Sequence, residues 1–253
     1  MTITLLGTGT SQGVPVIGCG CEVCISENPK DNRLRTSIHI EIENKSIVID
    51  TGPDFRQQML REKITNLDAV IFTHHHKDHV AGMDDIRSFN FLQEKPMPIY
   101  ANNSTKEQLQ KEFQYVFNPN GYGGAPRVLY NEITNYPFDI EGIPIKPVEV
   151  FHHKLPILGF RIQDFTYITD ANYISDEECE KIIGSKVLVI NALQKKPHIS
   201  HFTLDEAIQQ IEKINPGKAY LTHISHKMGL HAEVSKQLPE NTYLAYDGLK
   251  ITL

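Results

Sequence analysis

Short apolar segments separated by polar turns run along the chain, and they predict a series of β-strands. The central segment, residues 67–72 (LDAVIF), is almost continuously apolar, as expected for a buried strand. Further strands are expected at residues 2–6, 37–42, 46–50, 96–100, 145–151, 165–169 and 218–222. Helices are expected from Phe55 onward, at 84–89, at 105–117, where the pattern is amphipathic, and shortly after His201. Polar residues gather where several of the strands end.

The segment that follows the central strand, residues 73–85 (THHHKDHVAGMDD), combines histidines with a carboxylate. Its H-x-H-x-D-H pattern comprises His74, His76, Asp78 and His79. Because residues two apart in an extended chain share a side, His74 and His76 can face one metal ion while His75 points away. Asp78 and His79 come after the chain has begun to turn, and they can address a second ion. A solvated histidine-rich loop is the plain alternative, but imidazole mixed with carboxylate at a strand end favours metal binding.

Histidine and aspartate also follow three later strands of the prediction. His152 and His153 come after the strand at 145–151, Asp170 comes after the strand at 165–169, and His223 comes after the strand at 218–222. Any one of these residues alone would be ordinary, because Asp and His at a strand terminus are common in turns and caps.

The order of these residues resembles the metal-binding signature of the metallo-β-lactamase superfamily, most of whose members are hydrolases. The resemblance implies an α/β fold, a four-layer αβ/βα sandwich, and we expect residues 1–253 to form it as a single domain. It implies one divalent ion on His74, His76 and His152, a second on Asp78, His79 and His223, and Asp170 as the bridging carboxylate. It also favours His152 over His153, a choice that the sequence itself leaves open.

Three of the four cysteines, Cys19, Cys21 and Cys24, lie within six residues. Three thiolates lack only one ligand of a closed tetrahedral zinc site. If the segment after 218–222 stays extended, His223 and His226 point to opposite faces, which leaves His226 free to be the fourth ligand of a structural zinc. Chance or redox-active cysteines and an incidental histidine are the alternatives. The remaining cysteine, Cys179, is expected to pack in a helix.

The C-x-C-x-x-C and T-H-x-x-H motifs narrow the resemblance to the phosphoribosyl cyclic phosphodiesterase branch, known from carbon–phosphorus lyase pathways. It extends over nearly the whole chain. The matching segments are residues 7–9, 12–15, 19–24, 73–79, 169–170, 221–226 and 246–248. In that branch a histidine between the Asp ligand and the last His ligand can act as general acid. His201 matches that histidine because it lies just before a predicted helix. His198 is the other candidate for the general acid, and His201 could instead simply cap the helix.

The resemblance therefore implies a phosphodiesterase that opens a small cyclic phosphate. Two divalent ions, manganese or zinc, would lower the pKa of a bridging water and offset charge on the phosphate. We expect His201 and Asp78 to form the catalytic set, with protonated His201 donating to the leaving oxygen. Related proteins suggest a homodimer that binds a small phosphorylated substrate.

Two further segments are open to two interpretations. Asp50 ends the strand at 46–50, where it either orients a ligand histidine or caps the helix that begins near Phe55. Residues 118–126 (NPNGYGGAP) are rich in glycine and proline, and they predict an ordinary surface connection or a mobile loop beside the site.

Composition excludes some classes of protein. The 253 residues carry a net charge of −6 and scattered basic residues, so no long nucleic acid is expected as a partner. No apolar run is long enough to span a bilayer, and the start of the chain does not resemble a signal peptide, so we expect a cytoplasmic protein. A tRNA 3′-processing nuclease, a thioesterase or glyoxalase-like hydrolase that would not need His201, and an accessory or carrier protein like those of coenzyme PQQ biosynthesis are the competing functions.

Overall fold

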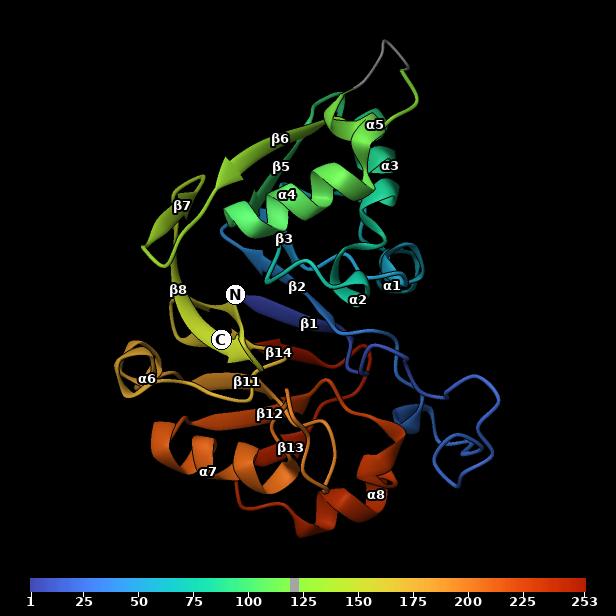
Figure 1. Cartoon of the computed structure of the whole chain (residues 1–253), viewed down its shortest axis with the longest axis vertical. Helices are drawn as coiled ribbons and strands as arrows, with labels where there is room; N and C mark the ends of the chain where they lie inside the picture. The colour runs from blue at the N-terminus through green and yellow to red at the C-terminus, as the bar shows by residue number, and fades with distance from the viewer. Residues whose placement is uncertain (119–122) are drawn as a thin grey trace.

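Two β-sheets form the centre of the computed structural model, which describes residues 1–118 and 123–253 and has seven strands per sheet within that part (Figure 1). The first sheet runs in the order β14 (Lys250–Thr252), β1 (Thr2–Gly7), β2 (Ser37–Ile42), β3 (Lys45–Ile49), β4 (Ala69–Ile71), β5 (Met97–Ala101) and β6 (Val128–Glu132). The second runs in the order β13 (Thr242–Leu244), β12 (Lys218–Thr222), β11 (Val187–Asn191), β10 (Phe165–Ile168), β9 (Leu155–Ile162), β8 (Ile143–His152) and β7 (Phe138–Ile140).

Helices cover the outer face of each sheet. Those that accompany the first sheet are α1 (Phe55–Glu62), α2 (Lys77–Val80), α3 (Arg87–Gln93), α4 (Asn103–Glu112) and α5 (Gln114–Phe117). Those that accompany the second are α6 (Asp176–Ile182), α7 (Leu204–Ile214) and α8 (His231–Val234). Short 3-10 helices occur at η1 (Pro29–Asp31), η2 (Met83–Ile86), η3 (His226–Met228) and η4 (Ser235–Gln237). The predicted αβ/βα sandwich is confirmed.

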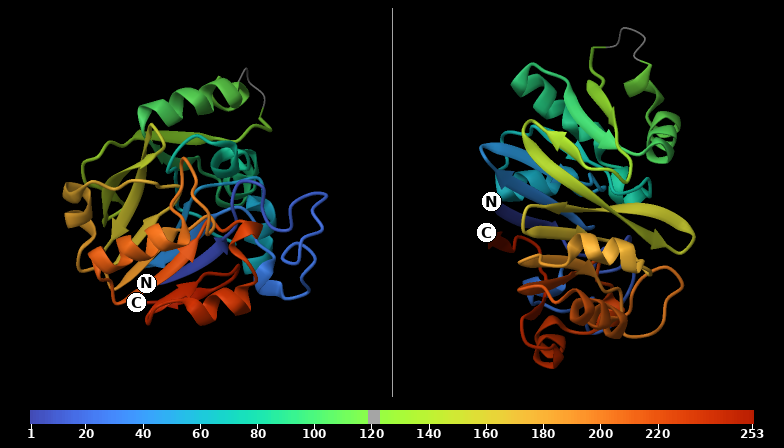
Figure 2. Two further views of the ribbon diagram at one scale, coloured as in Figure 1. Left: turned by 60° about the horizontal axis from the view of Figure 1, so that its bottom comes forward. Right: turned by 90° about the vertical axis from the view of Figure 1, so that its left-hand side faces the viewer.

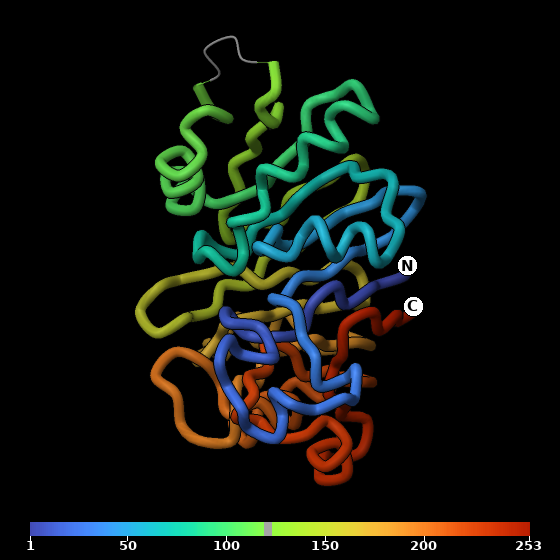
Figure 3. Tube along the Cα trace, turned by 90° about the vertical axis from the view of Figure 1, so that its right-hand side faces the viewer, coloured from blue at the N-terminus to red at the C-terminus, as the bar shows by residue number. Residues whose placement is uncertain are grey.

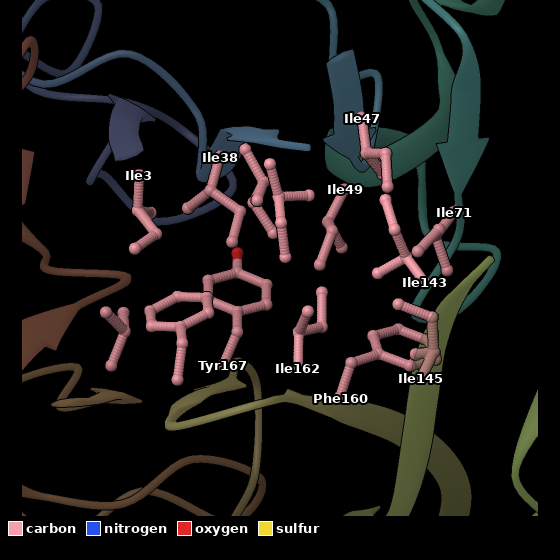
Figure 4. Close-up of a cluster of buried hydrophobic side chains, with 14 of the residues drawn as sticks. Ile3, Ile38, Ile47, Ile49, Ile71, Ile143, Ile145, Phe160, Ile162 and Tyr167 are labelled. Atoms are coloured by element: carbon pink, nitrogen blue, oxygen red, sulfur yellow. The ribbon is translucent and has the colours of Figure 1, made fainter. Parts of the chain in front are cut away.

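The central strand, β4, is apolar throughout because its side chains point alternately into two hydrophobic cores. In β4, Ala69 and Ile71 pack into the core between the two sheets, whereas Val70 packs into the core beneath the outer helices. Successive residues of a strand point to opposite faces, and both faces are covered here. Figure 4 shows the inner core, where Ile38 and Ile49 of the first sheet face Phe160 and Tyr167 of the second.

The two ends of the chain meet at one edge of the first sheet. β1 pairs antiparallel with β14, and the amino group of Met1 donates to the carbonyl oxygen of Leu253 at 3.0 Å (Figure 2). The last strand therefore completes the sheet that the first strand begins. No helix in the described part of the chain is long and apolar enough to cross a membrane.

One predicted helix, residues 105–117, is wrong in its extent. The Asn102 side chain caps a helix that starts earlier, at Asn103, and α4 ends at Glu112. Phe113 has φ −116° and ψ 47°, outside the helical region, because its ring is buried in the outer core and a second short helix starts after it. Of the predicted connection at 118–126, residues 119–122 lie outside the described residues. Cys179 is buried in α6, as predicted.

Candidate active site

The seven side chains predicted to bind two ions come from four strand ends and lie together. Four of them follow β4: His74, His76, Asp78 and His79. His152 is the last residue of β8, Asp170 follows β10, and His223 follows β12 directly. Their ligand atoms form two groups, in each of which all atoms lie within 4.8 Å of one another. One group contains His74, His76 and His152; the other contains Asp78, His79, Asp170 and His223.

Asp170 links the two groups through its two carboxylate oxygens. Oδ1 lies 3.3 Å from Nε2 of His79 and 3.1 Å from Nδ1 of His223. Oδ2 lies 4.0 Å from Nε2 of His74 and 3.3 Å from Nε2 of His201. The side chain is almost fully buried, and its two oxygens face two different sets of nitrogen atoms.

Asp50 orients one histidine of each group. Nδ1 of His79 donates to Oδ2 of Asp50 at 2.8 Å. The Thr73 hydroxyl also donates to Asp50, and it accepts from Nδ1 of His74 at 2.9 Å. Burial raises the pKa of Asp50, and the hydrogen bonds from His79 and Thr73 oppose that rise. Helix α1 has Asp54 at its N-cap position, so the structure excludes the capping interpretation of Asp50.

Three ring nitrogens of the clustered histidines have no hydrogen-bond partner within the described part of the chain, which bears on whether the site fits metal ions. Nε2 of His74, Nε2 of His79 and Nδ1 of His223 are buried and make no hydrogen bond within the described part of the chain. Buried polar atoms without partners are rare, and nitrogen and oxygen ligands of this kind suit zinc or manganese. Burial lowers the pKa of His74 well below its ordinary value and that of His223 to about 3, which favours the neutral ring that binds metals. Despite its burial, Asp170 and the other nearby carboxylates raise the pKa of His79. The residues present fit two divalent ions.

The structure brings His152 rather than His153 to the cluster. His152 is buried, and its Nδ1 donates to the carbonyl oxygen of Ser200 at 2.9 Å. His153 is exposed, and its backbone N–H donates to Asn172 Oδ1 at 2.7 Å. The contribution of Ser200 had no signal in the sequence, because it acts through a backbone carbonyl that every residue type has.

His201 lies at the cluster, and His198 lies behind it. Nε2 of His201 approaches Asp170, whereas its Nδ1 lies 3.2 Å from Nδ1 of the exposed His198. Helix α7 is capped by Thr203, which forms a reciprocal capping box with Glu206. The structure therefore excludes His201 as the cap of that helix, and it aims the Nε2 edge of His201 at the site.

The three clustered cysteines surround one histidine. Sγ atoms of Cys19, Cys21 and Cys24 lie 3.4, 3.3 and 3.5 Å from Nδ1 of His226. Zn–S and Zn–N bonds of about 2.3 and 2.0 Å in a tetrahedron separate their ligand atoms by about 3.5 Å, so the group fits zinc. The backbone N–H of Cys24, and next to it His226, lower the pKa of Cys21 to about 6, whereas burial raises the pKa of Cys24 to about 11.

The segment from His223 to His226 turns, whereas the prediction for His226 assumed an extended segment. His223 has φ +55°, and His226 begins η3, so the segment between them is not extended. A turn brings His226 to the cysteines instead. Figure 3 shows the N-terminal loop beside the C-terminal segment, where Thr10 N donates to Ile224 O and Ile224 N to Thr8 O. The cysteine loop is thus fastened next to the strand end that carries His223.

The fold and this arrangement of histidines and carboxylates agree with a comparison against known families. A model of the beta-lactamase superfamily domain matches residues 45–224, and the chain belongs to that superfamily. Within it, the chain groups with the PhnP family. A crystal structure described as a new diphosphatase from that family superposes with a TM-score of 0.93 at 40% identity, covering 100% of this chain and 97% of the other.

Two more proteins are similar to the chain, one in sequence over about half of its own length and one in fold. The chain is 40% identical over 253 residues to a Porphyromonas gingivalis protein named Octanoyltransferase, covering 99% of this chain but 51% of that protein. It spans about half the length of the curated relatives that it matches first. The Zn²⁺-bound PqqB of Methylobacterium extorquens superposes over 100% of both chains with a TM-score of 0.81 at 18% identity, which shows a shared fold alone.

Proposed function

We propose that the protein is a dinuclear metal-dependent phosphodiesterase that opens a small cyclic phosphate, of the phosphoribosyl cyclic phosphate or 2′,3′-cyclic nucleotide type. The observation that carries this proposal is the placement of Asp170, whose two oxygens face two separate groups of ligand atoms. A carboxylate so placed suits two adjacent ions, as in the sites of many phosphate-ester hydrolases. The 40% identity to a PhnP-family diphosphatase supports a phosphate-containing substrate.

The seven clustered residues would hold two ions, manganese or zinc. When bound, the ions supply an acidified water and neutralise charge on the phosphate. The chain itself fixes the directions of the ligand rings: Asp50 holds His79 directly and His74 through Thr73, and the Ser200 carbonyl holds His152. Such outer contacts keep the coordinating nitrogens aimed at the site before a substrate arrives. The cysteine group with His226 would hold a structural zinc.

His201 is our proposed general acid. Its Nε2 lies 3.3 Å from Oδ2 of Asp170, at the edge of the site, and its Nδ1 faces Ser200 Oγ at 3.0 Å. A proton on Nε2 can pass to the oxygen that leaves the phosphorus, a role worth about 10²–10⁴-fold in rate. Asp78, whose Oδ2 lies 3.2 Å from His79 Nε2, would help to hold the second ion.

Other functions have weaker support. The name Octanoyltransferase describes a protein about twice as long, so that activity is not carried over to this chain. A tRNA-processing nuclease would need a basic surface, whereas this chain has a net charge of −6. The expected homodimer and cytoplasmic location stay predictions.

The test is hydrolysis of bis(p-nitrophenyl) phosphate and a 2′,3′-cyclic nucleotide by protein reconstituted with manganese or zinc. Asp170→Ala should abolish turnover, and His201→Ala should lower kcat by about 10²–10⁴-fold. His153→Ala, a change at the exposed neighbour of His152, serves as the matched control and should leave kcat unchanged. Metal-loaded wild-type protein that cleaves a thioester but neither phosphodiester would overturn the proposal.

A further inference from the structure

Asn191, the last residue of β11, holds the backbone beside Asp170. The side chain is fully buried. Its Oδ1 accepts from the backbone N–H of Ala171 at 2.8 Å, and its Nδ2 donates to the carbonyl oxygen of Ala171 at 2.9 Å. One side-chain amide thus satisfies both polar groups of the residue that follows Asp170.

The ladder between β10 and β11 ends before Ala171, so the backbone of Ala171 needs another hydrogen-bond partner. β10 and β11 are parallel, and their last pair is Ile168 with Ile190. Asp170 then turns with φ +59°, a left-handed conformation that interrupts a ladder. A side-chain amide carries the same donor and acceptor as a peptide group. Asn191 therefore replaces the missing ladder partner and holds the chain immediately after the turn.

The backbone of Ala171 is also hydrogen-bonded to the loop that carries His201. The carbonyl oxygen of Ala171 also accepts from the backbone N–H of Phe202 at 2.8 Å. Ala171 follows Asp170 and Phe202 follows His201, and the side chains of Asp170 and His201 approach to 3.3 Å. The Asn191 amide and the Phe202 N–H donate to the same oxygen. Asn191 therefore holds the backbone from which the Asp170 side chain reaches His201.

Asn191 is linked to the strand end of His223 as well. β11 and β12 pair up to Asn191 with Thr222, and Ala192 N donates to Thr222 O at 2.9 Å. His223 follows Thr222 and has φ +55°. Asp170 and His223 thus lie directly next to residues that pair with Asn191, and His201 precedes Phe202, which shares the Ala171 carbonyl oxygen with Asn191.

We propose that Asn191 is a positioning residue of the active site, which sets the direction of the Asp170 carboxylate relative to His201 and His223. Its effect on turnover rests on the proposed function. Its effect on metal affinity does not, because affinity is measured without any substrate.

A second buried asparagine of the chain provides a matched control. Asn90 in α3 is almost fully buried, and its Nδ2 donates to the carbonyl oxygens of Lys95 and Arg127 at 3.0 Å. Its Oδ1 accepts from Arg127 N at 2.8 Å. The amide makes the same two-sided contact with one backbone residue, but neither Lys95 nor Arg127 neighbours a residue of the site in sequence.

The experiment compares Asn191→Asp with Asn90→Asp. Each change keeps the shape of the side chain, removes the amide donor and places a carboxylate against a carbonyl oxygen. We expect both variants to lose thermal stability. Asn191→Asp should also lower metal affinity, measured by competition with a chromogenic chelator, and kcat, each by about 10–100-fold, a loss typical of contacts that orient ligands. Asn90→Asp should leave both quantities unchanged.

Equal metal affinity and kcat in the two variants would overturn the proposal and leave Asn191 a structural residue. If Asn191→Asp does not fold, Asn191→Ser, which removes the two-sided contact without adding a charge, takes its place with the same expected losses. Wild-type protein that cleaves no phosphodiester, together with weakened metal binding in the Asn191 variant alone, would overturn the proposed function and support the positioning role.

Discussion

Nδ1 of His79 donates a 2.8 Å hydrogen bond to Oδ2 of Asp50, and both side chains are fully buried. The bond turns Nε2 of His79 toward Oδ2 of Asp78 at 3.2 Å and Oδ1 of Asp170 at 3.3 Å. Because Asp50 also reaches His74 through Thr73, one carboxylate outside the cluster orients a histidine in each of the two groups.

We expect Asp50→Asn to weaken metal binding by about 10–100-fold, because the uncharged amide orients His79 and Thr73 less firmly. Competition with a chelator, followed by metal analysis of the dialysed protein, measures the loss. Asp54→Asn is the control, since Asp54 holds Arg35 at 3.0 Å and contacts none of the clustered histidines. Equal affinity in the two variants would argue against an orienting role for Asp50.

Much of the site was predictable because its side chains follow apolar strands. His74, Asp170 and His223 each come directly after a segment whose apolar residues fix the strand, so each position in space follows from where the strand ends. Asn191 stands at the end of an equally apolar strand, 187–191, and the same signal applies to it. A neutral amide at a strand end is common in turns, however, so the signal did not indicate that Asn191 holds the site.

Other features depend on contacts that no local pattern encodes. The break between α4 and α5 arises from the burial of Phe113 in a core formed by distant strands. The left-handed turns at Asp170 and His223 are held by partners from other strands, and non-glycine residues seldom adopt them unaided. The sequence therefore predicted which residues gather, but it did not predict the turn that brings His226 to the cysteines.

We expect Cys21→Ser to remove one metal ion per chain and to lower the thermal stability, because the cysteine loop would lose its attachment to His226. Metal analysis of the purified protein should give about two ions instead of three. Cys179→Ser is the control: Cys179 is buried in α6, away from the other cysteines, so the metal content should stay at the wild-type value. Loss of zinc in both variants, or in neither, would count against the Cys₃His site.

Stability should fall below pH 6.5 partly because of His231. Nδ1 of His231 lies 3.2 Å from Nη2 of Arg33, which donates to it, so the ring is neutral. Burial, and next to it the Arg33 guanidinium, lower the pKa of His231 to about 4. The unfolded chain takes up a proton near pH 6.5, whereas the folded chain does so only near pH 4. The stabilising contribution is therefore complete above pH 6.5 and is lost as the pH falls toward 4.

We expect His231→Gln, whose amide oxygen can still accept from Arg33, to reduce this pH dependence. The difference between the free energies of unfolding at about pH 7.5 and about pH 5 should be smaller in the variant by about 1–2 kcal/mol, a figure that allows for solvent screening. Urea unfolding of metal-loaded protein measures it. His153→Gln, at an exposed histidine, should keep the wild-type dependence; an unchanged dependence in His231→Gln would contradict the assignment.

A close backbone approach at Gly52 sets the position of Asp78. A Cβ atom added to Gly52 would lie 2.2 Å from the carbonyl oxygen of Asp78, and the neighbouring Thr51 N–H donates to the carbonyl oxygen of His79 at 2.8 Å. We expect Gly52→Ala to displace the backbone of Asp78 and His79, to cost about 1–3 kcal/mol in the free energy of unfolding and to weaken metal binding. In the described part of the chain, a Cβ at Gly123 meets no atom within 4 Å, so Gly123→Ala controls for the added methyl group. Urea unfolding and chelator competition measure the two effects, and a Gly52→Ala variant that binds metal as tightly as the wild type would show that this approach is not what holds Asp78 at the site.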